Sequence, residues 1–200
     1  MNQTIPAIIK ETSRGYDTLA IDNVLLTSRR LFFTEEVDNV SCDSLLKSLI
    51  ALNDEDPDAE ITLFINSPGG DVYSGLAVFD YIRTMSAPLT TVCVGTAASM
   101  GALLFLAGNK ARRMMPHSQI MIHDPSFGGG SLAGKKPHEI ERIANDLKKT
   151  RDILGEIIAE VTGKTMKQIL RVTKEDSFFN AEEAIRFGLA TEIIEKGVRI

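Results

Sequence analysis

The stretch EITLFINSPGGDVYSGLAVFDYIRTM, Glu60 to Met85, decides how this 200-residue chain is built. It begins with a mostly apolar run, Glu60 to Ser67, which has the length and composition of a buried strand. The segment SPGGD then supplies a proline and two glycines, which are typical of a turn. From Val72 onward the apolar residues, among them Leu76 and Phe79, recur at helical spacing. The stretch therefore predicts a buried strand, a turn and a helix in succession.

The same alternation continues on both sides of this stretch. Residues 89–95 are rich in β-branched side chains and predict a strand that ends at Gly95, with a helix following near Ser99. The segments ARRMMP and SQIMIH predict two more strands. Upstream, VSCDSLLKSLIALND predicts a helix that ends before Pro57, and NVLLTSRRLFF predicts an extended segment. Because strands that alternate with helices form parallel sheets, we expect an α/β domain with a mostly parallel sheet.

The composition is that of an ordinary globular protein. Hydrophobic residues make up 44% and charged residues 24%, so the chain can form one domain with a substantial core. The net charge of −5 gives no electrostatic reason to expect a nucleic-acid partner. The cysteines Cys42 and Cys93 lie far apart in apolar surroundings, which predicts core thiols in a reducing compartment and no zinc site.

The sequence shows neither a secretory signal nor a membrane span. The N-terminus lacks a basic head followed by a long apolar segment. The longest nearly apolar run, Met100 to Ala107, is too short to cross a bilayer. We therefore expect a cytoplasmic location, or an organelle after removal of a targeting peptide that this sequence does not contain.

The second half of the chain changes character. Residues 127–137, FGGGSLAGKKP, lack periodicity and predict a flexible loop. An apolar stripe from Ile140 to Val161 then predicts one long helix, which either covers the core or packs on another subunit. Two shorter helices are predicted by the capping pairs Thr165 with Gln168 and Asn180 with Glu183.

Ser99 is the candidate nucleophile of the chain. It lies where the strand gives way to a helix, and the unpaired backbone N–H groups and dipole of a helix N-terminus stabilise negative charge. Its neighbours Ala97, Ala98 and Gly101 are small and let a substrate backbone approach. Considered alone, Ser99 is also a good helix N-cap. The pattern Ala-x-Ser-x-Gly only approximates a nucleophile elbow.

A serine nucleophile needs a base, and the chain has three histidines. His138 lies in a polar segment and His117 in a turn. His123 ends a strand at the carboxyl edge of the sheet, where α/β sites collect, although it could also be a core histidine. Asp124 follows His123 directly, but neighbouring strand residues point to opposite faces. Asp176 precedes a capped helix and is an orienting acid by position only.

The turn SPGGD supplies the last element of a candidate site. Gly70 has no side chain, so its backbone N–H could face a ligand directly. An ordinary turn is the alternative.

Taken together, these segments resemble a known family. The motifs INSPGGDVYSG, GTAASMGALL, MIHDP and EDSFFNAEEAIRFGLA occur in the order and spacing of the Clp protease proteolytic subunit family. The resemblance covers nearly the whole chain. It implies a serine endopeptidase with a crotonase-like α/β fold and a protruding handle, formed by a long helix plus a loop, in a single domain over residues 1–200.

The resemblance also implies the roles of individual residues. Carried onto the matching positions, Ser99 is the nucleophile, His123 the general base and Asp176 the orienting acid. The backbone N–H groups of Gly70 and Met100 form the oxyanion hole. No metal and no cofactor is implied for this chain, because ATP is used by the partner unfoldase.

The implied assembly is two stacked heptameric rings, a tetradecamer, that degrade unfolded proteins fed by an AAA+ unfoldase. The N-terminal axial segment covers about residues 1–18 and the handle about residues 127–162. Neither a nucleic acid nor a membrane is an implied partner.

The chain departs from the family pattern at several positions. Lys174 and Glu175 stand where the family usually has an acid and then an arginine that pairs across the rings. The handle loop is longer than usual, MIHDP replaces the common MIHQP, and Thr62 and Thr84 stand where aromatics are frequent. Two alternatives therefore stay open: a structural or regulatory paralogue that works in a mixed ring, and a crotonase-fold enzyme that acts on an acyl-thioester.

Overall fold

The structure is a computed structural model that describes residues 7–13, 15–128 and 132–197. Its centre is a twisted sheet with the strand order β3-β4-β5-β6-β9. All neighbours along this path are parallel, as the sequence predicts. The strands are β3 (Arg30–Phe33), β4 (Ile61–Ser67), β5 (Leu89–Ala98), β6 (Ala111–Met114) and β9 (Glu192–Ile193).

Two further strands attach where β5 changes partners. Residues 90–93 of β5 pair with β6, whereas residues 96–98 pair in parallel with β7 (Gln119–Ile122). Strand β8 (Ser177–Asn180) then pairs antiparallel with β7. The predicted end of β5 at Gly95 is therefore wrong. The second set of hydrogen-bond partners on β7 keeps the strand extended as far as Ala98.

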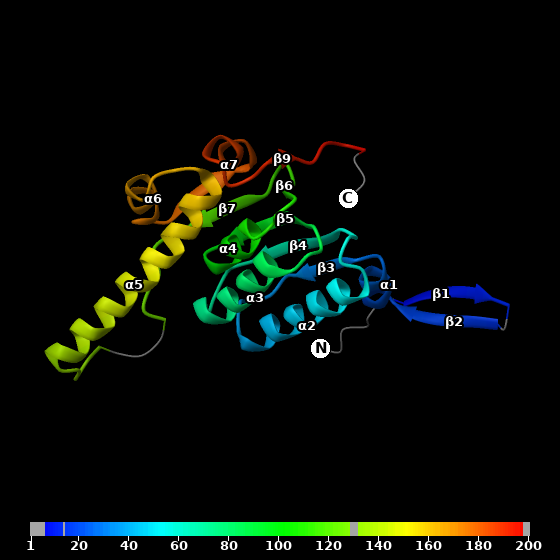
Figure 1. Ribbon diagram of the computed structural model, residues 1–200, viewed down its shortest axis with the longest axis horizontal. Coiled ribbons are helices and arrows are strands. Elements are labelled where there is room, and N and C mark those ends of the chain that lie inside the picture. The colour runs from blue at the N-terminus through cyan, green and yellow to red at the C-terminus, as the bar shows by residue number, and fades with distance from the viewer. Residues whose placement is uncertain (1–6, 14, 129–131, 198–200) are drawn as a thin grey trace.

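Helices follow one another along the sheet (Figure 1). The first five helices of this series contact one another in neighbouring pairs, and buried apolar side chains of all six form the main core with the sheet. Cys42 and Cys93 are both buried in this core, as predicted. The helices are α2 (Asn39–Glu55), α3 (Val72–Thr84), α4 (Met100–Leu106), α5 (Pro137–Thr162), α6 (Met166–Thr173) and α7 (Ala181–Phe187).

The predicted extended segment NVLLTSRRLFF is wrong in its first part. Its leucine-rich beginning belongs to helix α1 (Ile21–Thr27), and only Arg30–Phe33 form a strand. Leucine is a strong helix former, and Ser28 closes the helix by hydrogen bonds to the carbonyls of Val24 and Leu25. Ahead of α1, strands β1 (Ala7–Thr12) and β2 (Gly15–Ala20) pair antiparallel, and the sequence pattern predicted neither of them.

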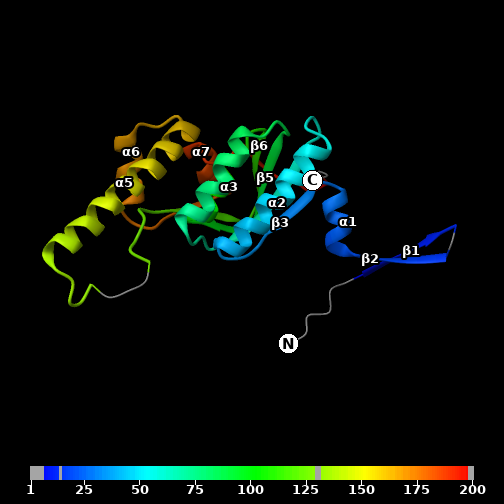
Figure 2. The same ribbon diagram turned by 60° about the horizontal axis from the view of Figure 1, so that its bottom comes forward.

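The long helix α5 is confirmed, and so are the two capped helices after it. Thr165 and Asn180 accept hydrogen bonds from the backbone N–H groups of Gln168 and Glu183, and both form capping boxes. The buried residues of α5 all lie in its second half, at 154, 155 and 158. The first half extends past the body of the molecule in both views (Figures 1 and 2).

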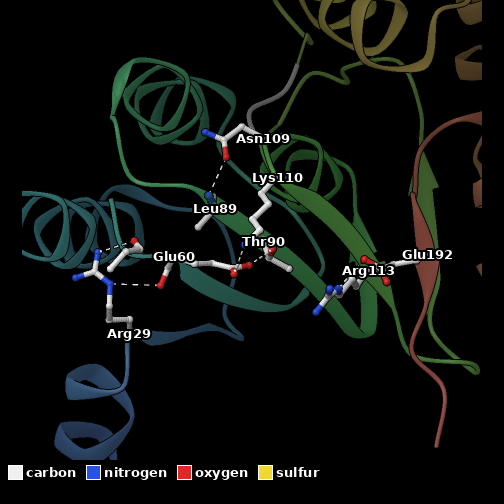
Figure 3. A network of polar contacts seen from close by, with 9 residues as sticks. Arg29, Glu60, Leu89, Thr90, Asn109, Lys110, Arg113 and Glu192 are labelled. Atoms are coloured by element: carbon white, nitrogen blue, oxygen red, sulfur yellow. Dashed lines mark hydrogen bonds and ion pairs between the residues drawn. The ribbon is translucent and has the colours of Figure 1, made fainter. Parts of the chain in front are cut away.

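Polar side chains bond to one another at the amino ends of β4, β5 and β6, and an ion pair joins β6 to β9 nearby (Figure 3). Glu60, just before β4, accepts hydrogen bonds from Thr90 and from Lys110 of the neighbouring segments, each over 2.5 Å. Arg113 of β6 pairs with Glu192 of β9 over 2.7 Å. Burial raises the pKa of the Glu60 carboxyl, but the bonds from Lys110 and Thr90 and the nearby positive charges outweigh it, so this pKa lies below its ordinary value.

Across the described ranges, no helix combines the length and the apolar character that a bilayer crossing requires.

Candidate active site

Ser99 lies at the junction of β5 and α4 in an unusual backbone conformation. Its φ of 52° falls in the left-handed region, which L residues seldom adopt and which costs about 1–3 kcal/mol. Its N–H donates to the carbonyl of Met121 on β7, which fixes the turn. Ser99 occupies the N-cap position of α4, but its side chain makes no capping hydrogen bond. The capping role considered for this hydroxyl is therefore wrong.

The Ser99 hydroxyl is directed at His123 instead. Ser99 Oγ lies 2.8 Å from His123 Nε2, within hydrogen-bonding distance. His123 follows the last residue of β7, and its side chain is 25% exposed, so it is not a core histidine. His117 and His138 are both exposed.

Asp176 approaches the other ring nitrogen of His123. The distance from Asp176 Oδ1 to His123 Nδ1 is 3.3 Å. The antiparallel pairing of β7 with β8, in which Ile122 faces Ser177, brings these two distant parts of the chain together. The structure thus places Ser99, His123 and Asp176 in a row, which the sequence positions alone left as a guess.

Asp124 has a different partner, although it is adjacent to His123. Its carboxylate accepts a hydrogen bond from Thr173 Oγ1 over 2.5 Å. Its backbone N–H donates to the Thr173 carbonyl over 2.6 Å. The expectation that strand neighbours diverge is confirmed, since His123 faces Asp176 and Asp124 faces Thr173.

The turn after β4 packs directly on the nucleophile. A Cβ atom built on Gly69 would lie 2.6 Å from Ser99 Cβ and 2.9 Å from the backbone nitrogen of Met100, so a larger residue cannot fit without displacement. Val37 holds the turn on both sides of Gly70: its N–H donates to the Gly69 carbonyl, and its own carbonyl accepts from the N–H of Asp71. The sequence pattern assigned a role to Gly70 only, although the glycine pair in SPGGD also pointed to Gly69.

Two backbone donors remain available beside Ser99. Within the described part of the chain, the N–H groups of Gly70 and Met100 donate to no other protein group. Met100 is the first residue of α4, where intrahelical acceptors are lacking. Met100 follows Ser99 in the chain, and Gly70 follows Gly69, which packs against Ser99, so both predicted oxyanion-hole residues offer a donor next to residues that contact or adjoin the nucleophile.

A small pocket opens next to these groups. Besides Ser99 and His123, its walls are largely apolar side chains from α3, α4 and α5. The apolar members are Val72, Met100, Leu103, Ile122, Pro125, Leu154 and Ile158. Such walls suit an apolar side chain of a bound ligand.

The arrangement is suited to acyl transfer. A hydroxyl, an imidazole and a carboxylate in a row can activate the hydroxyl as a nucleophile, and nearby N–H groups can bind an oxyanion. Of the residues that the structure describes, no three or more His, Cys, Asp or Glu side chains are grouped so as to hold a metal ion.

Comparisons with known proteins cover nearly the whole chain. Residues 13–197 match the family model described as Clp protease. The chain is 38% identical over 193 residues to the ATP-dependent Clp protease proteolytic subunit of Deinococcus radiodurans. That alignment covers 96% of this chain and 93% of the relative.

Proposed function

The chain belongs to the Clp protease family, and from this premise we propose that Ser99, His123 and Asp176 form the catalytic triad of a serine endopeptidase. The protein is a protease of the ATP-dependent Clp type, and its substrates are unfolded proteins. The observation that carries the proposed triad is the 2.8 Å contact between Ser99 Oγ and His123 Nε2, with Asp176 on the opposite ring nitrogen.

Each step of the reaction has a group in place. His123 Nε2 takes the proton of the Ser99 hydroxyl as Oγ attacks the peptide carbonyl, while Asp176 orients the ring and stabilises the imidazolium. The N–H groups of Gly70 and Met100 bind the oxyanion of the tetrahedral intermediate. His123 then gives its proton to the leaving amine, and water hydrolyses the acyl-enzyme by the same route.

The apolar side chains around Ser99 favour substrates with an apolar residue next to the scissile bond. A substrate residue that precedes the scissile bond would lie against side chains such as Leu103, Leu154 and Ile158. Burying an apolar side chain there is favourable, whereas burying a carboxylate without a partner is costly. We therefore expect peptides with leucine or methionine before the scissile bond to be cleaved faster than the same peptides with aspartate.

The exposed half of α5 supports assembly into stacked rings. Ile140 at its beginning is 40% exposed, and none of the described residues in this half is buried. A partner surface would cover this part of the apolar stripe. We propose that residues 127–162 form the handle between two heptameric rings, although residues 129–131 lie outside the described residues.

The remaining partners follow from the same family membership. An AAA+ unfoldase uses ATP and feeds the chamber, and this chain itself needs no cofactor. The N-terminal axial segment, about residues 1–18, would face that partner, although residues 1–6 and 14 lie outside the described residues. The proposed location is the cytoplasm.

A mixed ring with a paralogue is the second candidate assembly. Lys174 and Glu175, which reverse the family's usual charges, are both exposed on the same loop as Asp176. A contact across rings at this loop would therefore favour a partner with the complementary charge order.

Two measurements on the purified chain test the proposal. A fluorophosphonate should label wild-type protein but not Ser99→Ala, and fluorogenic peptides should be hydrolysed only by the former. Native mass on the same samples reports whether the chain alone forms a double ring. An unlabelled wild-type protein in an assembled double ring would contradict the peptidase and leave the acyl-thioester enzyme as the better candidate.

A further inference from the structure

Two hydrogen bonds join the segment that holds His123 to the segment that holds Asp176. The backbone N–H of Asp124 donates to the Thr173 carbonyl over 2.6 Å, and Thr173 Oγ1 donates to Asp124 Oδ1 over 2.5 Å. Thr173 is the last residue of α6 and is only 3% exposed. We refer to this two-bond pair as the Asp124–Thr173 clasp. Because one bond uses the backbone and the other the side chains, it fixes both the distance and the orientation of the two segments.

The clasp is one of two fixed points around the proposed triad. His123 lies between the clasp on one side and the ladder pair Ile122–Ser177 on the other. The facing segment, residues 174–176, connects the same two points. The segment 174–176 therefore has three residues where the opposite segment has only His123. Because it is the longer of the two, it must bulge. This bulge brings Asp176, the last of the three, beside the histidine ring.

Asp176 has little else to hold it. Its side chain is 64% exposed, and across the described residues its carboxylate makes one ion pair, the 3.3 Å contact to His123 Nδ1. An exposed carboxylate with a single partner retains much rotamer freedom. The position of its backbone therefore decides how often the carboxylate faces the ring. A further bond from Ser177 Oγ to the Val172 carbonyl spans the same bulge.

We propose that Asp124 and Thr173 are positioning residues of the peptidase: their clasp sets the backbone from which Asp176 orients His123. This inference rests on the proposed triad and assigns Asp124 a role through Thr173 rather than as the acid itself. Small displacements of a catalytic group lower rates by up to about 100-fold, so the loss of the clasp should be visible in kcat.

Each residue of the clasp can be replaced either by one that loses its hydrogen-bonding group or by one that keeps it. Thr173→Val keeps the shape of the side chain but removes the donor, whereas Thr173→Ser keeps the hydroxyl. Asp124→Ala removes the acceptor, whereas Asp124→Asn keeps an amide oxygen that can accept the same bond. Thr91 offers a matched control, since its buried hydroxyl donates to the Phe105 carbonyl in the core.

The decisive experiment is a double-mutant cycle on the full chain. Thr173→Val is made in the wild-type background and in the Asp176→Asn background, and the rates of fluorophosphonate labelling and of peptide hydrolysis are followed. We expect Thr173→Val and Asp124→Ala to lower kcat by about 10- to 100-fold with little change in KM. In the Asp176→Asn background the further loss should be less than about twofold, because the clasp acts through that carboxylate.

The conservative variants complete the test. Thr173→Ser and Asp124→Asn should retain most of the activity. Thr91→Val should lower the melting temperature by a comparable amount without the loss in kcat. If Thr173→Val lowered kcat by the same factor in both backgrounds, with Asp176 and with Asn at that position, the proposed positioning role of the clasp would be overturned. A Thr173→Ser variant as slow as Thr173→Val would overturn it as well. Normal rates of labelling and peptide hydrolysis in Asp176→Asn alone would instead overturn the triad itself, so the two failures are distinguishable.

Discussion

The two edges of the central sheet use polar side chains in opposite ways. At the amino edge, Glu60 is bonded by Thr90 and Lys110, and the neighbouring ion pair of Arg113 with Glu192 joins the last two strands (Figure 3). Here the polar groups satisfy one another. These bonds join neighbouring strands, and the proposed reaction uses none of these groups.

The carboxyl edge leaves its groups available. Ser99 has a positive φ and no capping bond, and the N–H groups of Gly70 and Met100 have no protein acceptor in the described ranges. Asp176 is largely exposed. Because bonds within the fold would stabilise the two N–H groups, their availability close to a serine in a strained conformation supports their proposed role in binding an oxyanion. The difference separates the structural edge from the reactive one.

Removing the nucleophile should have the largest effect on the carboxyl edge. Ser99→Ala should lower peptide hydrolysis by roughly 10⁴-fold or more, because the members of a triad act as a unit. The ring assembly should remain, since Ser99 Oγ supports no backbone group. Peptidase assays and native mass on one preparation measure both. Near-normal turnover would remove Ser99 from the site.

Replacing the acids tests which carboxylate belongs to the reactive set. Asp176→Asn should lower the rate by orders of magnitude, up to about 10⁴-fold, because the amide favours the wrong histidine tautomer. Asp124→Asn should have a much smaller effect, since its amide oxygen still accepts the bond from Thr173. Steady-state kinetics on both variants decide the question. The reverse ranking would give the orienting role to Asp124.

The reactive edge should also depend on assembly, which the amino edge should not. Lys174 and Glu175 are exposed next to Asp176, so a contact across rings at this loop would be screened by salt. One exposed pair contributes about 0–1 kcal/mol, but a symmetric double ring repeats it many times. We expect ring stacking and peptidase activity to fall together with increasing ionic strength, or to require a paralogue.

Analytical ultracentrifugation from low to high salt, with activity assayed on the same samples, measures this dependence. Repeating the series with both charges exchanged, in a Lys174→Glu, Glu175→Lys double variant, tests whether the order of the charges matters. A double ring of the chain alone that stays intact and active at every salt concentration would contradict the expectation.

The smallest expected effect concerns the amino edge. Because the folded pKa of Glu60 lies below its ordinary value of 4.5, its ionised form stabilises the protein above that pH, and this contribution is lost as the pH falls through the folded value. Glu60→Gln should therefore lower the free energy of unfolding at pH 7, by about 0–1 kcal/mol since the pair is partly exposed and screened.

Denaturant unfolding at neutral pH and at a series of pH values falling below 4.5 measures this difference, with the exposed Glu195→Gln as the control. The wild-type advantage over Glu60→Gln should shrink as the pH falls, while peptidase activity at pH 7 stays unchanged. A large loss of activity would mean that the two edges are not independent.

The sequence predicted the fold in most of its parts. Periodicity located β4, α2, α3 and the long helix α5, because each is long enough for its apolar pattern to be unambiguous. The capping pairs located α6 and α7. The sequence did not predict some short or exposed elements. Helix α1 has no buried residue to mark its inner face, and β8 and β9 are recognised only from their pairing with other strands.

At the site, local sequence patterns pointed to Ser99 and His123: a small-residue turn follows a strand, and a histidine ends a strand. The family resemblance assigned Asp176. The folded chain shows that this carboxylate, and not that of Asp124, meets the histidine, because the two acids differ in their long-range pairing and not in their local pattern. The ladder between β7 and β8 and the Asp124–Thr173 clasp join segments about fifty residues apart, and no local signal in either segment specifies that contact.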